Sequence, residues 1–212
     1  VLVVGGGAAG LSAAIGARKA GADVILLERF GCFGGVITTV GMETLGWYRY
    51  EGTEDTEGIG REMERLAERM GGSTKWPYND SQCLDAERFK VVADRLVEEH
   101  GIRPLLHTLA VDVAIKEGRL VGIITESKSG RQMIEAKRVV DATGDADICY
   151  LAGCPFTSLS VAERMSVTPV FNCVGVDTQQ FLEYTRQNPK TYRSWGDEWS
   201  QYTTGKEDHL LT

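Results

Sequence analysis

The sequence predicts an α/β fold built around a parallel β-sheet, and three features near the N-terminus lead to this prediction. Residues 1–4 form a short apolar run that stops at glycine, which is typical of a buried strand. Helical spacing of the apolar residues from Leu11 to Ile15 then predicts a helix that ends at Gly21. A second apolar run at 24–27 predicts another buried strand. Two strands joined by a helix are expected to be parallel neighbours.

The turn between the first strand and the helix has the sequence Gly5-Gly6-Gly7-Ala8-Ala9-Gly10, which contains the pattern G-x-G-x-x-G. Gly5 permits a tight turn, Gly7 lets the backbone approach a diphosphate, and Gly10 lets the helix pack closely on the strand. The helix N-terminus offers free N–H groups and a partial positive charge. Glu28 ends the second strand, where a carboxylate binds both ribose hydroxyls and disfavours a 2′-phosphate. The unit therefore predicts a site for an ADP-containing dinucleotide.

A second glycine-rich loop covers residues 29–39 and includes the pair Gly34-Gly35. A plain NAD-binding domain would instead continue to alternate strands and helices at this point. Two helices are predicted beyond the loop, from apolar residues at helical spacing within 59–70 and 89–97. Both apolar stripes are interpreted as faces that pack into the core.

Alternating apolar patterns farther along the chain predict a three-stranded antiparallel insertion, with strands at 105–116, 119–126 and 131–140. His107 falls within the first of these strands. The third strand runs into the small-residue turn Asp141-Ala142-Thr143-Gly144-Asp145, where a second approach to a dinucleotide can occur. Such an insertion argues against a simple NAD dehydrogenase, which stays the nearest competing interpretation.

Together, the glycine turn with Glu28-Arg29, the Gly34-Gly35 pair and the turn at 141–145 resemble the FAD-dependent oxidoreductases of the glutathione-reductase-type fold. Within them the sequence is most similar to the branch of fumarate reductase and succinate dehydrogenase flavoproteins and heterodisulfide-reductase-like flavoproteins. The resemblance implies a Rossmann-like FAD-binding domain at 1–155, with a parallel sheet and a three-stranded antiparallel insertion. It implies the start of a substrate or cap domain at 156–212. The family's C-terminal return segment is missing, so the chain is expected to be an N-terminal portion of a longer protein.

The resemblance also implies a set of cofactor-contacting residues, each carried over at its own position. The first glycine turn would hold the diphosphate, and the acidic residue after the second strand would hold the adenosine ribose, with the arginine beside it. The second glycine pair and the two apolar residues after it would lie along the diphosphate, the ribityl chain and the isoalloxazine ring. One alanine of the insertion would meet the adenine, and the small-residue turn would form a second contact. In chain order these residues are Gly5, Gly7, Ala8, Ala9, Gly10, Glu28, Arg29, Gly34, Gly35, Val36, Ile37, Ala110, Ala142, Thr143, Gly144 and Asp145.

FAD is the implied cofactor, and the second glycine loop indicates how it is held. Members of the family with covalently attached flavin have a histidine in the segment that is Gly-Gly-Val-Ile-Thr here, at 34–38. The resemblance therefore implies non-covalent FAD. No catalytic acid or base is assigned, and no metal site is predicted.

The implied function is hydride transfer between FAD and an unidentified small-molecule substrate, by an enzyme of the cytoplasm. Two alternatives stay open. One is a flavin-bearing electron-relay or assembly subunit, with catalysis on a partner protein. The other is a flavin-dependent tRNA-modifying protein.

Composition and charge bear on these alternatives. The net charge of −7, from 23 basic and 30 acidic residues, argues against a broad basic surface for nucleic acid. No stretch approaches the roughly 18 consecutive apolar residues of a membrane-spanning helix. The five cysteines have no metal-ligand spacing, and Cys149 and Cys154 do not form a C-x-x-C redox pair. A reduced set of thiols is therefore expected.

Overall fold

A computed structural model describes residues 1–45, 49–50, 53–54, 57–75, 82–164, 167, 169–171 and 173–188. Val1–Val170 form one compact unit and Phe171–Thr212 a second. The described part of the second unit contains the helix α6 (Thr178–Gln187). Its N-terminus is capped by the Asp177 carboxylate, which accepts a hydrogen bond from the Gln180 amide at 2.9 Å.

The first unit is organised around a four-stranded sheet in which each described pair of strands is parallel. Its strands are β1 (Leu2–Val4), β2 (Ile25–Leu27), β7 (Arg103–Leu105) and β11 (Val139–Asp141), in the order β11-β1-β2-β7. The helix α1 (Ala8–Lys19) joins β1 to β2, and the chain turns after it at Gly21 with a φ of +83°. The predicted strand–helix–strand unit is therefore confirmed.

A second sheet is antiparallel and comes from the insertion. Its strands are β8 (Leu109–Lys116), β9 (Arg119–Ser127) and β10 (Gly130–Glu135), in the order β10-β9-β8. The register of β8 on β9 shifts between Ala110 and Asp112, where the strand carries a bulge or a similar irregularity. The predicted three-stranded antiparallel insertion is confirmed.

Helices and short hairpins complete the described part of the first unit. The two predicted amphipathic helices are present as α3 (Ile59–Arg69) and α4 (Ala86–Glu99). The remaining elements are α2 (Val36–Thr39), β3 (Arg49–Tyr50), β4 (Thr53–Glu54), β5 (Ser73–Lys75), β6 (Gln82–Leu84), α5 (Asp147–Leu151) and a 3₁₀ turn at Val161–Glu163. Among the described residues, no helix has the length and apolar character needed to cross a bilayer.

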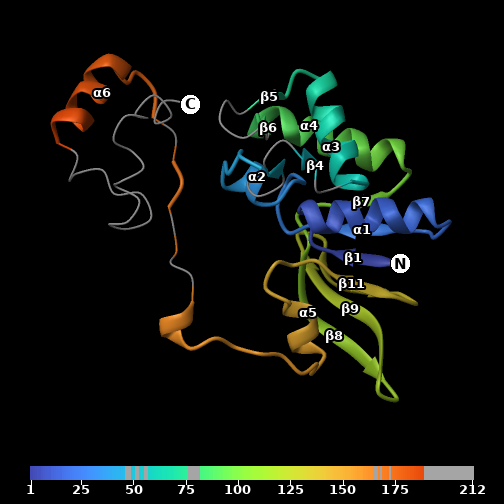
Figure 1. Cartoon of the computed structure of the whole chain (residues 1–212). Helices are drawn as coiled ribbons and strands as arrows, with labels where there is room; N and C mark the ends of the chain where they lie inside the picture. The colour runs from blue at the N-terminus through green and yellow to red at the C-terminus, as the bar shows by residue number, and fades with distance from the viewer. Residues whose placement is uncertain are drawn as a thin grey trace. The chain divides into compact units, whose positions relative to one another are not determined.

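Alternating side chains of the parallel sheet build two separate cores. Val3 and Leu26 belong to a cluster that also contains the apolar faces of α1, α3 and α4. Their neighbours Leu2 and Leu27 belong to a second cluster, which includes Ile123 of β9. Because successive residues of a strand face opposite sides, the parallel sheet is packed between helices and the antiparallel sheet (Figure 1). The loops that follow each strand lie at the carboxyl edge of the parallel sheet.

The predicted strand at 105–116 is wrong at its N-terminal end. Leu105 ends β7, where it pairs with Leu27 of the parallel sheet. The expectation that His107 lies in a strand is also wrong, because it turns the chain with a φ of +50° before β8 begins at Leu109. Alternation along one segment does not tell which partner strand it will join, and a change of sheet therefore leaves no sequence signal.

The predicted strand at 131–140 is divided between two sheets for the same reason. The Ala136 amide donates to the Val121 carbonyl at 3.0 Å, at the end of the antiparallel pairing. The Leu2 amide then donates to the Arg138 carbonyl at 3.0 Å, at the start of the parallel pairing. The short link between β10 and β11 thus places the turn at 141–145 at the carboxyl edge of the parallel sheet.

Candidate functional site

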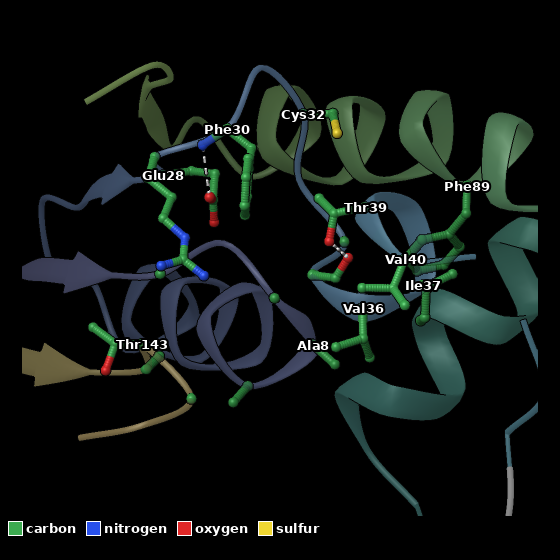
Figure 2. Close-up of a pocket in the computed structure, with 18 of the residues that line it drawn as sticks. Ala8, Glu28, Phe30, Cys32, Val36, Ile37, Thr39, Val40, Phe89 and Thr143 are labelled. Atoms are coloured by element: carbon green, nitrogen blue, oxygen red, sulfur yellow. Dashed lines mark hydrogen bonds between the residues drawn. The ribbon is translucent and has the colours of Figure 1, made fainter. Parts of the chain in front are cut away.

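A cleft of about 1100 Å³ opens at the carboxyl edge of the parallel sheet. Its volume exceeds the roughly 300–1000 Å³ of most small-ligand pockets, so it can take a long ligand. All of the predicted cofactor-contacting residues line it except Gly10 and Asp145. Figure 2 shows Glu28 and Phe30 toward one end, and Val36, Ile37 and Val40 toward the other, with Ala8 at the start of α1.

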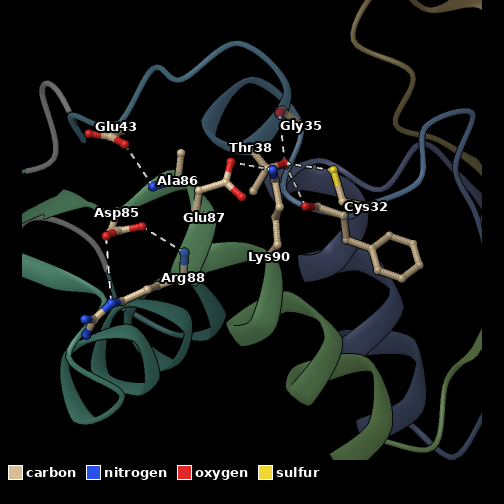
Figure 3. A network of polar contacts seen from close by, with 10 residues as sticks. Cys32, Gly35, Thr38, Glu43, Asp85, Ala86, Glu87, Arg88 and Lys90 are labelled. Carbon is tan, nitrogen blue, oxygen red and sulfur yellow. Dashed lines mark hydrogen bonds and ion pairs between the residues drawn. The ribbon is translucent and has the colours of Figure 1, made fainter. Parts of the chain in front are cut away.

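The N-terminus of α1 faces this cleft without a side-chain cap. Its N-cap residue is Gly7, which has no side chain to accept a hydrogen bond, and Ala8 and Ala9 line the cleft. The first amides of a helix have no intrahelical acceptor and carry a partial positive charge. At α4 the corresponding amides are satisfied, because Asp85 accepts from Arg88 N at 2.8 Å and Glu43 from Ala86 N at 2.9 Å (Figure 3). The start of α1 is therefore suited to an anionic group.

Three loops pack closely against one another beneath the cleft, at glycines where a side chain would collide with the neighbouring backbone. A Cβ on Gly5 would lie 2.2 Å from the Ala142 carbonyl oxygen, and a Cβ on Gly10 would lie 1.7 Å from the Gly5 oxygen. Gly35 has a φ of +59°, and a Cβ there would lie 2.8 Å from the Gly7 Cα atom. The two glycine-rich turns and the small-residue turn at 141–145 therefore fit only as a set.

Gly7 is different, since nothing in the described protein requires a glycine there. Its φ of −73° is open to any residue. A Cβ on Gly7 would meet its nearest atom, the Gly35 Cα, at an ordinary 3.6 Å. The missing side chain instead leaves the backbone open to the cleft, as expected where a ligand approaches closely.

The buried Glu28 side chain connects the first glycine turn with the second strand. Its two carboxylate oxygens accept hydrogen bonds from Gly6 N at 2.7 Å and Phe30 N at 2.9 Å. Each carboxylate oxygen has a second acceptor site, and the residue also lines the cleft. Glu28 can therefore hold the turn in place and still accept ligand hydroxyl groups.

We expect Glu28→Gln to lower the free energy of unfolding by about 1–3 kcal/mol, since one amide N–H would then face the Gln NH₂ group instead of an acceptor. Affinity for a ribose-containing ligand should fall about tenfold or more. Urea unfolding and ligand titration of the variant measure the two effects. Glu126→Gln, at an exposed ion pair with Arg131, is the control and should change stability by less than about 1 kcal/mol. Equal effects of the two substitutions would contradict this role of Glu28.

Asp141 holds the third loop at the edge of the cleft. One carboxylate oxygen accepts from Thr143 N at 3.1 Å and Thr143 Oγ1 at 2.8 Å, and the other accepts from Cys149 N at 2.8 Å. Burial raises the pKa of this carboxyl, but the hydrogen bonds from Cys149 and Thr143 outweigh it, and the net pKa lies below the usual value. The ionised form is therefore the one that fits this loop.

The lowered pKa of Asp141 predicts a defined loss of stability in acid. The carboxylate stabilises the fold above the pKa that it has in the unfolded chain, near 3.9. This contribution disappears as the pH falls through the lower pKa of the folded state. We expect the free energy of unfolding to fall more steeply below about pH 4 in the wild type than in Asp141→Asn, as measured by urea unfolding at each pH. Parallel pH profiles would contradict this assignment.

Several residues line the cleft that the sequence analysis did not assign to a binding site. Thr39 and Val40 at the end of α2, Met63 of α3 and Phe89 and Lys90 of α4 all line it. Phe89 and Met63 are members of the predicted core stripes, so their helical spacing was the available signal for placing them in the interior. No sequence pattern predicts that Lys90 lines the cleft, because its position beside the second glycine loop depends on how α4 packs (Figure 3).

The second glycine loop is held by its own side chains. Thr38 Oγ1 donates to the Phe33 carbonyl at 2.7 Å, and Thr39 Oγ1 donates to the Gly35 carbonyl at 2.7 Å. The Gly34 amide donates to the Gly6 carbonyl at 2.8 Å, which ties this loop to the first one. Val36, 57% exposed, is left projecting at the cleft. Among the described residues, an apolar side chain is thus left open to the cleft beside the first glycine turn.

Comparison with protein families identifies the group. The sequence model of the FAD dependent oxidoreductases matches residues 1–210. The chain belongs to this family. FAD is the family's cofactor, and the uncapped start of α1, the open backbone at Gly7 and the buried Glu28 carboxylate fit its diphosphate and ribose.

Individual relatives are distant, and each is longer than the chain. A probable fumarate reductase, Ifc3, of Shewanella frigidimarina is 28% identical in an alignment that covers 68% of the chain and 32% of that protein. A geranylgeranyl bacteriochlorophyll reductase-like structure from Thermoplasma acidophilum is 21% identical, with a TM-score of 0.58 over 76% of the chain and 43% of its own. THI4 from Thermovibrio ammonificans is 22% identical, with a TM-score of 0.51 over 71% of the chain and 59% of its own. The two solved structures support the Rossmann-like FAD-binding fold.

Proposed function

We propose that the protein is an oxidoreductase that transfers hydride between a small-molecule substrate and non-covalently bound FAD. The observation that carries the proposal is the open turn at Gly7. There an uncapped helix N-terminus meets the second glycine loop, and a carboxylate stands at the end of the neighbouring strand. This arrangement supplies donors for a diphosphate and acceptors for the hydroxyls of the attached ribose.

The adenosine half of FAD is assigned to the end of the cleft near Glu28. The amides of Ala8 and Ala9 would donate to the diphosphate, while the Glu28 oxygens accept from the ribose hydroxyls. The Arg29 guanidinium lies 4.8 Å from the centre of the Phe30 ring, and this contact would hold it beside the adenosine. Ala110 sits where β8 loses its regular pairing, so its backbone is available to the adenine.

The flavin ring is assigned to the opposite end, beside the second glycine loop. Val36 and Ile37 would contact the ring and exclude water from it, with Gly34 and Gly35 allowing the ribityl chain to pass. FAD supplies the hydride chemistry when it is bound. The segment 34–38 offers no histidine, cysteine or tyrosine for covalent attachment. The small-residue turn, through residues 142–145, would contact the other side of the cofactor.

We also propose that residues 1–155 are the cofactor-binding part and that residues 156–212 begin a substrate domain. The substrate-contacting groups would then come largely from beyond the cofactor cleft. The proposal includes a small-molecule substrate and an electron-transfer partner protein. The cytoplasmic location stays a prediction.

Anaerobic flavin spectroscopy of the full-length protein tests the proposed reaction. We expect at least one small-molecule donor to bleach the visible band of oxidised FAD, or one acceptor to restore it after chemical reduction. Because one relative is named a probable fumarate reductase, fumarate is the first acceptor to try. The Gly7→Ala protein supplied with equal free FAD is the control for reactions in solution. A flavin that exchanges electrons only with a co-purifying protein would contradict direct action on a small molecule and favour the relay function.

A further inference from the structure

The C-terminal end of α5 places two cysteines together, although their sequence spacing does not suggest a redox pair. Cys154 N donates to the Cys149 carbonyl at 2.9 Å, and Gly153 N donates to the Tyr150 carbonyl at 3.0 Å. Gly153 has a φ of +74°. These are the two hydrogen bonds and the left-handed residue of a Schellman motif, which frequently brings the side chains of its first and last residues together. In this helix those residues are Cys149 and Cys154.

The hydrogen bond limits how far apart the two residues can be. Adding the N–Cα bond and the Cα···O span to its 2.9 Å keeps the Cα atoms within about 6.8 Å of each other. Disulfide-bonded cysteines usually have Cα atoms roughly 4.4–6.8 Å apart. The rings of Tyr150 and Phe156 also meet edge to face, with centroids 5.6 Å apart, and this contact holds the turn closed. The Cα atoms are therefore close enough for a disulfide, and the two thiols interact with each other.

The geometry points to a reversible dithiol–disulfide pair formed by Cys149 and Cys154, a modification site that lies outside the flavin cleft. Both thiols are free in the structure, with Cys154 exposed and Cys149 half-buried. The pair is connected to the cofactor site through Asp141, which accepts from Cys149 N and from Thr143. Disulfides in reducing compartments are usually transient and redox-sensing, and an exposed thiol beside a resolving thiol fits that use.

The co-reactant is a low-molecular-weight disulfide. The Cys154 thiolate attacks one of its sulfurs, which forms a mixed disulfide and releases one small thiolate. Cys149 then loses its proton and attacks the Cys154 sulfur, which closes the protein disulfide and releases the second small thiolate. The two protein thiols lose two electrons and two protons, and the small disulfide is reduced to two thiols.

The two cysteines have different roles in this exchange. A hydrogen bond from the Cys149 thiol to the Asp141 carboxylate raises the pKa of this thiol, and burial, the charge of Asp141 and the neighbouring Cys154 add to the effect. Cys149, which is also the less exposed of the two, is therefore a poor first nucleophile and acts as the resolving thiol, while the exposed Cys154 meets the oxidant.

Thiol mapping of the full-length protein after equilibration with oxidised and reduced glutathione tests the pair. We expect the Cys149 and Cys154 thiols to be lost together, with a mass lower by two hydrogens, to return with a reducing dithiol, and to leave the far-ultraviolet circular dichroism unchanged. In Cys149→Ser a glutathione adduct should accumulate on Cys154, and in Cys154→Ser the Cys149 thiol should stay free. The exposed Cys173 is the internal reference for oxidant action.

Two results would overturn the proposal. One is wild-type protein in which Cys154 keeps glutathione while Cys149 stays a free thiol. The other is an unmodified Cys149 and Cys154 in samples whose Cys173 carries glutathione.

Discussion

Gly10→Ala is expected to lower the free energy of unfolding by about 3 kcal/mol or more and to abolish FAD binding, because the added methyl group collides with the turn that precedes α1. Its Cβ would lie 1.7 Å from the Gly5 carbonyl oxygen and 3.4 Å from the Ala142 side chain. The collision is with backbone, so no change of side-chain rotamer relieves it. Urea unfolding and FAD titration by flavin fluorescence measure the two losses.

Gly16→Ala is the matched control on the same helix. Its Cβ would meet the Ile59 side chain at an ordinary 3.6 Å. Alanine also favours the helix over glycine, so we expect a gain of about 0.5–1 kcal/mol and unchanged FAD affinity. A Gly10→Ala protein as stable as Gly16→Ala would show that the first turn does not have the described packing.

Gly7→Ala is expected to separate folding from cofactor binding. Its backbone conformation suits alanine, and the nearest atom would be 3.6 Å away, so the stability of the cofactor-free protein should change by no more than about 0.5 kcal/mol. FAD affinity should fall about 100-fold or more, because the methyl group keeps the diphosphate from the α1 amides and each lost charged hydrogen bond is worth about 1.5–3 kcal/mol.

The same two measurements decide the outcome for Gly7→Ala. A stable variant that binds FAD like the wild type would place the diphosphate elsewhere in the cleft. An unfolded variant would show that Gly7 is required by the protein itself. Only normal stability with lost binding supports the assignment of this turn to the cofactor.

The strand–helix–strand unit was predictable because its signals are local. The apolar runs at 1–4 and 24–27, the glycine turn and Gly21 each specify backbone geometry within a few residues. The change of sheet at Leu105 was not predictable, because it depends on pairing with Leu27, far away in the sequence. Local patterns gave the elements, and long-range pairing decided how some of them are joined.

The candidate site also combines features that local sequence patterns predict with contacts that depend on the fold. Gly5, Gly7, Gly10 and Glu28 could be chosen from spacing, and the turn at 141–145 from its place after a predicted strand. The resemblance added Arg29, residues 34–37 and Ala110. The contact between Gly7 and Gly35 and the clamp of Asp141 on Thr143 and Cys149 became visible only in three dimensions. The Gly7–Gly35 contact and the Asp141–Cys149 hydrogen bond leave no pattern in the sequence, because each joins segments whose spacing is set by the fold.

The central claim, that this cleft holds FAD without a covalent bond, is tested most directly by one absorption measurement. Visible spectra of the purified full-length protein are recorded before and after acid precipitation. We expect a flavin spectrum from the native protein and release of intact FAD into the supernatant. Flavin that stays in the precipitate would contradict non-covalent attachment, and a colourless protein that takes up no added FAD would contradict the site itself.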